Sequence, residues 1–152
     1  DVDAYYQRAF EELDLDIPGD LRLRAARATQ GSPYMLQLIG YNIGNRCKTG
    51  EHVTPEQVDG AIEASKADFE NDVCETTLAA LSDQDVAFLD AMTDDEDAVS
   101  RISDVAKRMS VTPDYAQKYR RRLIDAGVIE QARRGYVRFA VPYMADYLRS
   151  QL

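Results

Sequence analysis

The sequence predicts a mainly α-helical chain in two parts: a small helical bundle, then a second module that ends in a β-hairpin. Apolar residues recur at helical spacing through the first half, and the period changes to two after Gly127. Residues 1–97 hold 7 Lys and Arg against 22 Asp and Glu, a net charge of −15, whereas residues 98–152 hold 11 against 5, a net charge of +6. This asymmetry favours two modules with different partners and makes the basic module a candidate for nucleic-acid binding.

The composition is that of a globular protein rather than a disordered one, since 45% of the residues are hydrophobic and 30% are charged. No apolar run approaches the roughly 20 residues of a membrane-spanning helix. We therefore expect no membrane partner and a cytoplasmic location. Cys47 and Cys74 fit no close metal or redox spacing and are expected to be small buried thiols.

Local start and stop signals divide the first half into helices. Apolar side chains recur at helical spacing over residues 2–13, and Asp20 is expected to cap a second helix. Gly31 is expected to end that helix in the left-handed conformation. The segment Thr54-Pro55-Glu56-Gln57 is a capping box that opens a long helix. These helices predict a first domain over residues 1–80.

A second domain is expected over residues 81–152. The segment Ser82-Asp83-Gln84-Asp85 caps its first helix, and the acidic run at 94–97 follows. The run lacks the alternating ligands and central glycine of a calcium loop, so we interpret it as a solvated loop. Apolar residues between 99 and 109 predict a short second helix.

A third helix and a hairpin complete the second domain. Thr112 and Pro113 start the helix, and Gly127 stops it. Residues 128–131 and 136–141 then alternate with period two, which predicts two strands joined by a turn with a basic tip.

The order helix, helix, tight turn, helix and hairpin is that of a winged helix-turn-helix. Residues 102–130 resemble this superfamily in the Asp104-Val105-Ala106 core and in the exit from Leu123 to Ile129. Ala116, Tyr119 and Leu123 are expected to pack inward from the third helix. The expected DNA contacts, which lie on the outer face of that helix and on the hairpin, are Thr112, Gln117, Lys118, Arg121, Arg122, Arg133, Arg134 and Arg138.

Other interpretations of this basic module stay open. Its basic side chains could form a solvated face or pair with the acidic half of the chain. Winged helices also serve as protein-docking modules, so a docking or autoinhibitory module without DNA binding is the alternative function. Asp114, at the start of the third helix, is unfavourable near phosphate although it stabilises the helix N-terminus.

The segment from Ala28 to Gly40 resembles the helical lid of AAA+ and related signalling-type P-loop ATPases, including origin-recognition-like relatives. In those families a Gly-x-Pro motif begins a lid helix over the nucleotide, and a winged helix often follows. Gly31 and Pro33 match the motif, which implies that they and Tyr34 lie near the nucleotide. Many AAA+ lids carry a sensor arginine where Tyr34 stands, so the likeness shifts toward the signalling-type and origin-recognition-like relatives. An ordinary break between two helices is the alternative interpretation.

The resemblance implies that the chain is the C-terminal part of an ATPase that uses ATP and Mg²⁺. No phosphate-binding loop of the Gly-x4-Gly-Lys-Ser/Thr type occurs in the sequence, so the ATPase domain is expected upstream of Asp1. This chain alone is expected to hold no cofactor, metal or catalytic site and neither to bind ATP tightly nor to hydrolyse it. His52 is its one histidine, which leaves little material for a zinc site or a hydrolytic triad. A hinge near Ala79 to Ser82 is expected to couple nucleotide state to DNA binding.

Overall fold

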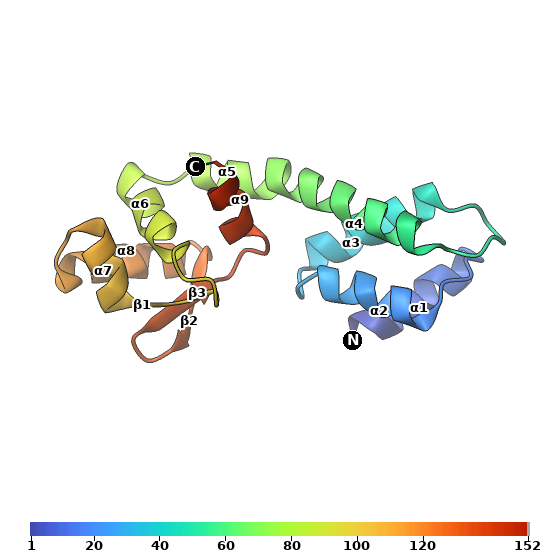
Figure 1. The fold of residues 1–152 in the computed structure, drawn as a ribbon, viewed down its shortest axis with the longest axis horizontal. Coiled ribbons are helices and arrows are strands. Elements are labelled where there is room, and N and C mark those ends of the chain that lie inside the picture. The colour runs from blue at the N-terminus through green and yellow to red at the C-terminus, as the bar shows by residue number, and fades with distance from the viewer. Residues whose placement is uncertain (152) are drawn as a thin grey trace. The chain divides into compact units, whose positions relative to one another are not determined.

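The computed structural model describes residues 1–151 and confirms the mainly α-helical class with a β-hairpin (Figure 1). The chain divides into two compact units, Asp1–Phe69 and Glu70–Leu152. None of the helices in residues 1–151 combines the length and the apolar character that crossing a bilayer requires.

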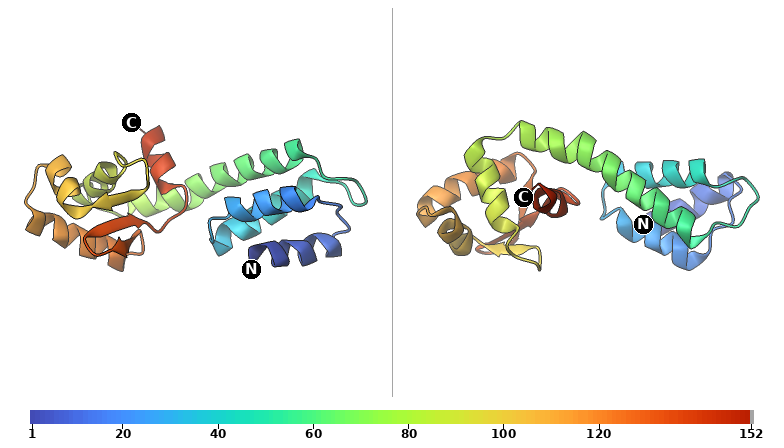
Figure 2. Two further views of the ribbon diagram at one scale, coloured as in Figure 1. Left: turned by 60° about the horizontal axis from the view of Figure 1, so that its bottom comes forward. Right: turned by 45° about the horizontal axis from the view of Figure 1, so that its top comes forward.

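The first unit is a bundle of four helices (Figure 2). In it α1 packs against α2, and α3 packs against α4. The Tyr6 hydroxyl donates a 2.8 Å hydrogen bond to the carbonyl of Leu36, which satisfies this polar group inside an apolar core. The helices are α1 (Val2–Glu12), α2 (Gly19–Ala28), α3 (Pro33–Arg46) and α4 (Pro55–Phe69). The largest buried side chains of this core are Tyr6, Phe10, Met35, Ile39 and Ile43.

The helices α3 and α4 both start at a side-chain cap, and the cap predicted at Thr54 is confirmed. The Ser32 hydroxyl accepts a hydrogen bond from the backbone N–H of Met35, and Pro33 is the first residue of α3. The Thr54 capping box is also present, because the Gln57 amide oxygen accepts from the Thr54 backbone N–H at 2.9 Å. The expected cap at Asp20 is wrong. The helix α2 begins one residue earlier, at Gly19, so Asp20 lies inside its first turn, where a carboxylate still complements the helix dipole.

Replacing Gly31 with alanine is expected to lower the free energy of unfolding of residues 1–69 by about 1 kcal/mol, because Gly31 has a φ of +76°, which L-residues with a Cβ adopt at a cost. Crowding is not the reason, since a Cβ at Gly31 would meet nothing within 4 Å. Gly60→Ala, inside α4, is the matched control and is expected to stabilise the unit by a similar amount. Urea denaturation measures both variants, and changes of the same sign would contradict a conformational cost at Gly31.

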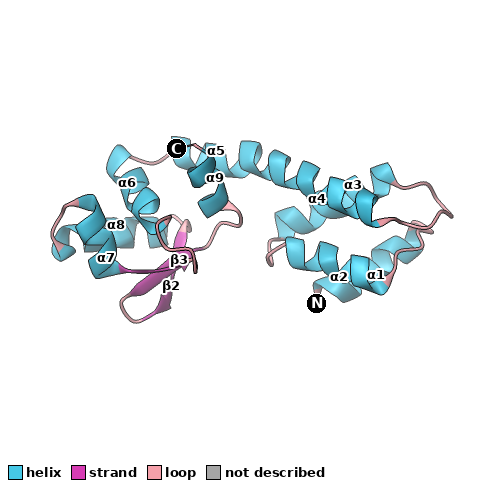
Figure 3. Ribbon diagram, in the orientation of Figure 1, coloured by secondary structure: helices cyan, strands magenta, loops and turns pink. Residues whose placement is uncertain are grey.

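The second unit contains several helices and a three-stranded antiparallel sheet (Figure 3). The strand order is β1-β3-β2, so the hairpin strand β3 is central. The helices α6, α7 and α8 pack against one another. The elements are the π-helix η1 (Glu70–Cys74), α5 (Glu75–Ala79), α6 (Asp83–Met92), β1 (Val99–Arg101), α7 (Ile102–Met109), α8 (Pro113–Asp125), β2 (Ile129–Arg133), β3 (Tyr136–Phe139) and α9 (Met144–Ser150).

The strand β1 corrects one expectation. The apolar spacing predicts a single helix over residues 99–109, but Val99–Arg101 pairs with β3 and the helix α7 starts only at Ile102. The spacing of Val99 and Ile102 fits a helix, whereas the partner strand lies far along the chain and supplies the hydrogen bonds that make these residues extended.

The boundary between the units lies earlier in the chain than the expected domain boundary at 80/81. Residues 70–80 belong to the second unit because η1 packs against α9 there. The Cys74 thiol contacts the carbonyl of Pro142 at 3.8 Å, and this side chain is fully buried. The boundary thus coincides with the change from α4 to the π-helix η1, not with the segment from Ala79 to Ser82.

Candidate nucleic-acid interface

The helix α8 has one buried face and one exposed face. Its N-terminus is capped by Thr112, whose hydroxyl accepts a 3.2 Å hydrogen bond from the backbone N–H of Tyr115, and Pro113 follows at the first helical position. Ala116, Tyr119 and Leu123 are buried at helical spacing, as predicted. These inward contacts fix which side of α8 faces solvent.

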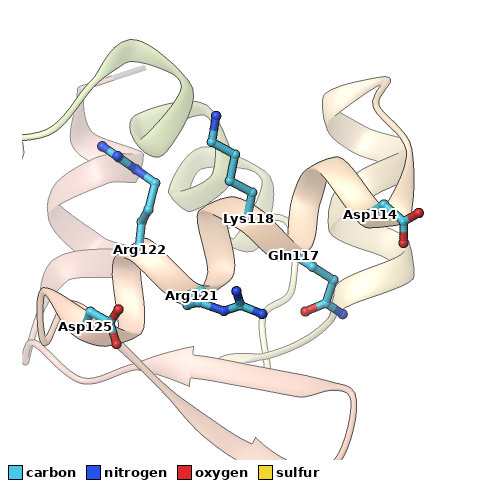
Figure 4. Close-up of a pocket in the computed structure, with 6 residues that line it drawn as sticks. All are labelled: Asp114, Gln117, Lys118, Arg121, Arg122 and Asp125. Carbon is cyan, nitrogen blue, oxygen red and sulfur yellow. The ribbon is translucent and has the colours of Figure 1, made fainter.

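A shallow hollow runs along the exposed side of α8. Figure 4 shows that Lys118 and Arg122 extend to one side of the helix, while Gln117 and Arg121 lie on the side toward the viewer. Carboxylates stand at both ends of the hollow, Asp114 at the first turn and Asp125 at the last. The face therefore offers donors in its middle and anionic acceptors at its ends. Its lining residues are Asp114, Gln117, Lys118, Arg121, Arg122 and Asp125.

Arg122 is bound to a carboxylate of its own unit. Its Nε and Nη2 donate to the two oxygens of Asp85 at 3.1 and 3.0 Å. The Asp85 side chain is only 1% exposed, whereas that of Arg122 is 54% exposed. Asp85 also accepts hydrogen bonds from the backbone N–H and the hydroxyl of Ser82, which completes a capping box at the start of α6. One buried carboxylate thus fixes the start of α6 and ties it to α8.

The hydrogen bond from Arg122 lowers the pKa of Asp85, and burial opposes this effect. A carboxyl group whose pKa is lower in the folded state stabilises the fold above its unfolded pKa, and this contribution is lost as the pH falls through the folded pKa. We expect the free energy of unfolding of residues 70–152 to decrease below about pH 4. Chemical denaturation across pH 7 to 3 should show a smaller decrease in Asp85→Asn, which removes the titrating group, and in Arg122→Gln, which removes the largest cause of the lowered pKa. An unchanged pH profile in both variants would contradict this role for the pair.

The hairpin carries the second group of predicted contacts. The Arg133 guanidinium lies 3.9 Å from the centre of the Tyr136 ring, which is a close cation–π contact. Arg134 and Gly135 form the exposed turn, and Gly135 has a φ of +80°. Arg138 is paired with Glu130 on the neighbouring strand at 2.7 Å, so its charge is largely compensated.

Arg101 belongs to this group although the sequence did not indicate it. The strand β1 places it directly opposite Tyr136, with its guanidinium carbon 5.8 Å from the ring centre. Arg101 lies beside Tyr136 only because β1 pairs with β3, and these two strands are far apart in the sequence. The strand β1 is itself only 3 residues long. The local sequence places Arg101 inside a predicted helix and gives no signal that it lies beside the hairpin.

The residues expected near a nucleotide lie in the first unit. Gly31 and Ser32 form the turn between α2 and α3, and Pro33 starts α3. Tyr34 is 45% exposed, and its ring packs edge-on against Phe69, with ring centres 5.8 Å apart. The chain here forms a regular start of α3, with the Tyr34 side chain beside it. In residues 1–151 no group of three or more His, Cys, Asp or Glu side chains is arranged to hold a metal ion.

The predicted DNA contacts fall into two neighbouring sets in one unit. Thr112, Gln117, Lys118, Arg121 and Arg122 belong to α8 or cap it, and Arg133, Arg134 and Arg138 belong to the hairpin. The helix and the first hairpin strand pack together, and Arg120 of α8 donates a 3.1 Å hydrogen bond to Gln131 of β2.

The part of the chain that carries these residues matches a known protein family. A family model described as a domain of unknown function (DUF8462) matches residues 71–148, which include α8 and the whole hairpin. No curated protein and no solved structure matches the chain. Since the match covers half of the 152 residues, the chain belongs to the DUF8462 family.

Proposed function

We propose that the chain binds double-stranded DNA through residues 70–152, with α8 in the major groove and the β2–β3 hairpin on the adjacent backbone. The observation that carries this proposal is the exposed face of α8. It presents Gln117, Lys118 and Arg121 to solvent beside the basic tip of the hairpin, while the opposite face is buried. The arrangement of three helices and a hairpin supports a winged helix-turn-helix mode of docking.

The exposed side chains divide by the contacts they can make. Arg121 can donate two hydrogen bonds to guanine, and Gln117 can pair with adenine. Lys118 is a compact cation suited to a phosphate, as are Arg133 and Arg134 at the hairpin. The carboxylates of Asp114 and Asp125 repel phosphate, so they favour a pose in which the middle of α8 approaches the DNA most closely.

Three of the expected contacts have other partners and carry less of the proposal. Arg122 is held by Asp85, Arg138 by Glu130, and the Thr112 hydroxyl caps α8. A guanidinium that already has a carboxylate partner contributes less net charge to phosphate binding. We therefore assign the main contacts to Gln117, Lys118, Arg121, Arg133 and Arg134.

We also propose that residues 1–69 form the lid of a P-loop ATPase whose nucleotide-binding domain supplies the ATP and Mg²⁺ site. The turn at Gly31 and Ser32 and the start of α3 at Pro33 support it, because an exposed helix N-terminus suits an anion. In this proposal the protein acts in the cytoplasm and the lid responds to nucleotide. The chain by itself neither hydrolyses ATP nor binds it tightly.

Protein docking is the second candidate function, and one observation favours it. Residues 70–152 hold 11 Lys and Arg against 15 Asp and Glu, a net charge of −4, so the unit as a whole repels DNA and only its α8 and hairpin face attracts it.

Fluorescence anisotropy of a labelled mixed-sequence duplex, titrated with residues 1–152 at low ionic strength, tests the first proposal. Saturable binding supports it. An absence of binding at low ionic strength would overturn it and favour the docking function. The ATPase proposal is tested separately, by adding a non-hydrolysable ATP analogue and Mg²⁺ to a longer chain that includes the upstream domain.

A further inference from the structure

A row of side chains crosses the three-stranded sheet close to the hairpin turn. In the central strand Tyr136 stands opposite Arg101 of β1 on one side and Arg133 of β2 on the other. Residues directly opposite each other on adjacent strands project from the same face of a sheet. The buried side chains of Ser100 and Val137, the next residues along, point to the other face. The row therefore lies on the exposed face.

The two arginines converge on one aromatic ring. The guanidinium carbon of Arg133 is 3.9 Å from the Tyr136 ring centre, and that of Arg101 is 5.8 Å from it. The backbone holds this convergence in place, because the N–H of Ile102 donates a 3.0 Å hydrogen bond to the carbonyl of Gly135 at the hairpin turn. The end of β1 is thus fixed beside the turn.

These two cations differ from other arginines of the same unit. Arg108, Arg122, Arg138 and Arg149 each form an ion pair with a carboxylate. Within the part of the chain that the structure describes, neither Arg101 nor Arg133 forms such a pair. Two guanidinium groups without a carboxylate partner that contact the same ring favour an anionic ligand that both can bind.

The row favours a phosphate rather than a base. A base-stacking site needs an open aromatic face, whereas Arg133 covers the Tyr136 ring at 3.9 Å. Guanidinium groups offer forked N–H donors that match phosphate oxygens.

We propose that Arg101, Tyr136 and Arg133 form a clamp for one backbone phosphate of the bound duplex, with Tyr136 as the positioning residue that orients the two guanidinium groups. This inference rests on the proposed DNA-binding function. It adds a strand, β1, and two residues, Arg101 and Tyr136, to the interface.

The test is duplex-DNA binding by residues 1–152 over a series of salt concentrations. Removing both groups in the double variant Arg101→Gln/Arg133→Gln should reduce the magnitude of the slope of log K against log salt by about 0.9, the value for one lost phosphate contact. Since both groups hold the same phosphate, each single variant should reduce the slope by less than this, because the remaining guanidinium group still contacts that phosphate. Arg24→Gln, in the first unit, is the charge-matched control and should keep the wild-type slope.

Replacing Tyr136 changes no charge, so its effect is measured as a change in DNA affinity and not in the salt slope. Tyr136→Leu should weaken binding about threefold, and Tyr136→Phe, which keeps the ring, should bind like the wild type. Thermal unfolding checks that both variants are folded, and the exposed arginine variants test the clamp even if Tyr136→Leu does not fold. A wild-type slope in the double variant, a reduction of about 1.8 in it (two separate phosphates), or an equal reduction in Arg24→Gln would overturn the clamp, while DNA binding by the wild type would still support the proposed function. An absence of wild-type binding would overturn both.

Discussion

Arg121→Glu is expected to weaken the binding of duplex DNA by residues 1–152 about 100-fold. The guanidinium lies in the middle of the exposed face of α8, and it makes no ion pair with any residue that the structure describes. The substitution removes a base or phosphate contact worth about 1–3 kcal/mol and introduces a charge that repels the backbone. Fluorescence anisotropy at constant ionic strength measures the change.

The control for this substitution is Arg24→Glu, which makes the same change of charge on α2 in the first unit. It is expected to change the affinity by less than about threefold, because Arg24 lies outside the proposed interface and is paired with Asp59. Equal losses in Arg121→Glu and Arg24→Glu would assign the effect to net charge and contradict a specific role for α8.

Leu123→Ala is expected to lower the free energy of unfolding of residues 70–152 by about 3 kcal/mol and the melting temperature by about 15 °C. Leu123 is fully buried on the inner face of α8, so its truncation removes apolar contacts and leaves a cavity. The adjacent Arg121 and Arg122 depend on this packing for their orientation, and DNA affinity should fall once a fraction of the unit is unfolded.

Ile124→Ala is the matched comparison, because this neighbouring residue on the same helix is only half-buried. It should cost about 1 kcal/mol. Differential scanning calorimetry distinguishes the two variants. A smaller loss of stability in Leu123→Ala than in Ile124→Ala would contradict an orientation of α8 in which Leu123 faces the core.

The orientation of α8 could be predicted from local sequence because it depends on local rules. A cap at Thr112, a proline after it and apolar residues at 116, 119 and 123 define both the helix and its buried face. The hairpin could be predicted for the same reason, because side chains alternate with period two on either side of the Gly135 turn.

Contacts made between distant parts of the chain could not be predicted in this way. Asp85 was expected to cap a helix, and it does, but nothing near it in sequence indicates that it also binds Arg122, 37 residues away. Arg101 reaches the hairpin only through the pairing of β1 with β3. Three extended residues are too few to establish a period of two, so the helical spacing from Val99 to Ile102 was misleading.

The boundary between the two units has a similar explanation. The apolar pattern of α4 continues past Phe69 and suggests one unbroken helix in the first domain, yet Cys74 is buried against Pro142 of the second unit. Residues 70–80 belong to the second unit because η1 packs against α9. The apolar periodicity of the segment itself does not reveal this contact.

The dependence of DNA affinity on salt tests the central proposal most directly. Phosphate contacts are assigned to Lys118, to Arg134 and to the pair Arg101 and Arg133, which shares one phosphate. Anisotropy titrations of a mixed-sequence duplex over a range of about 50 to 300 mM salt should therefore give a slope of log K against log salt of about −3. A slope near zero, or no binding at the lowest salt concentration, would contradict DNA recognition by α8 and the hairpin.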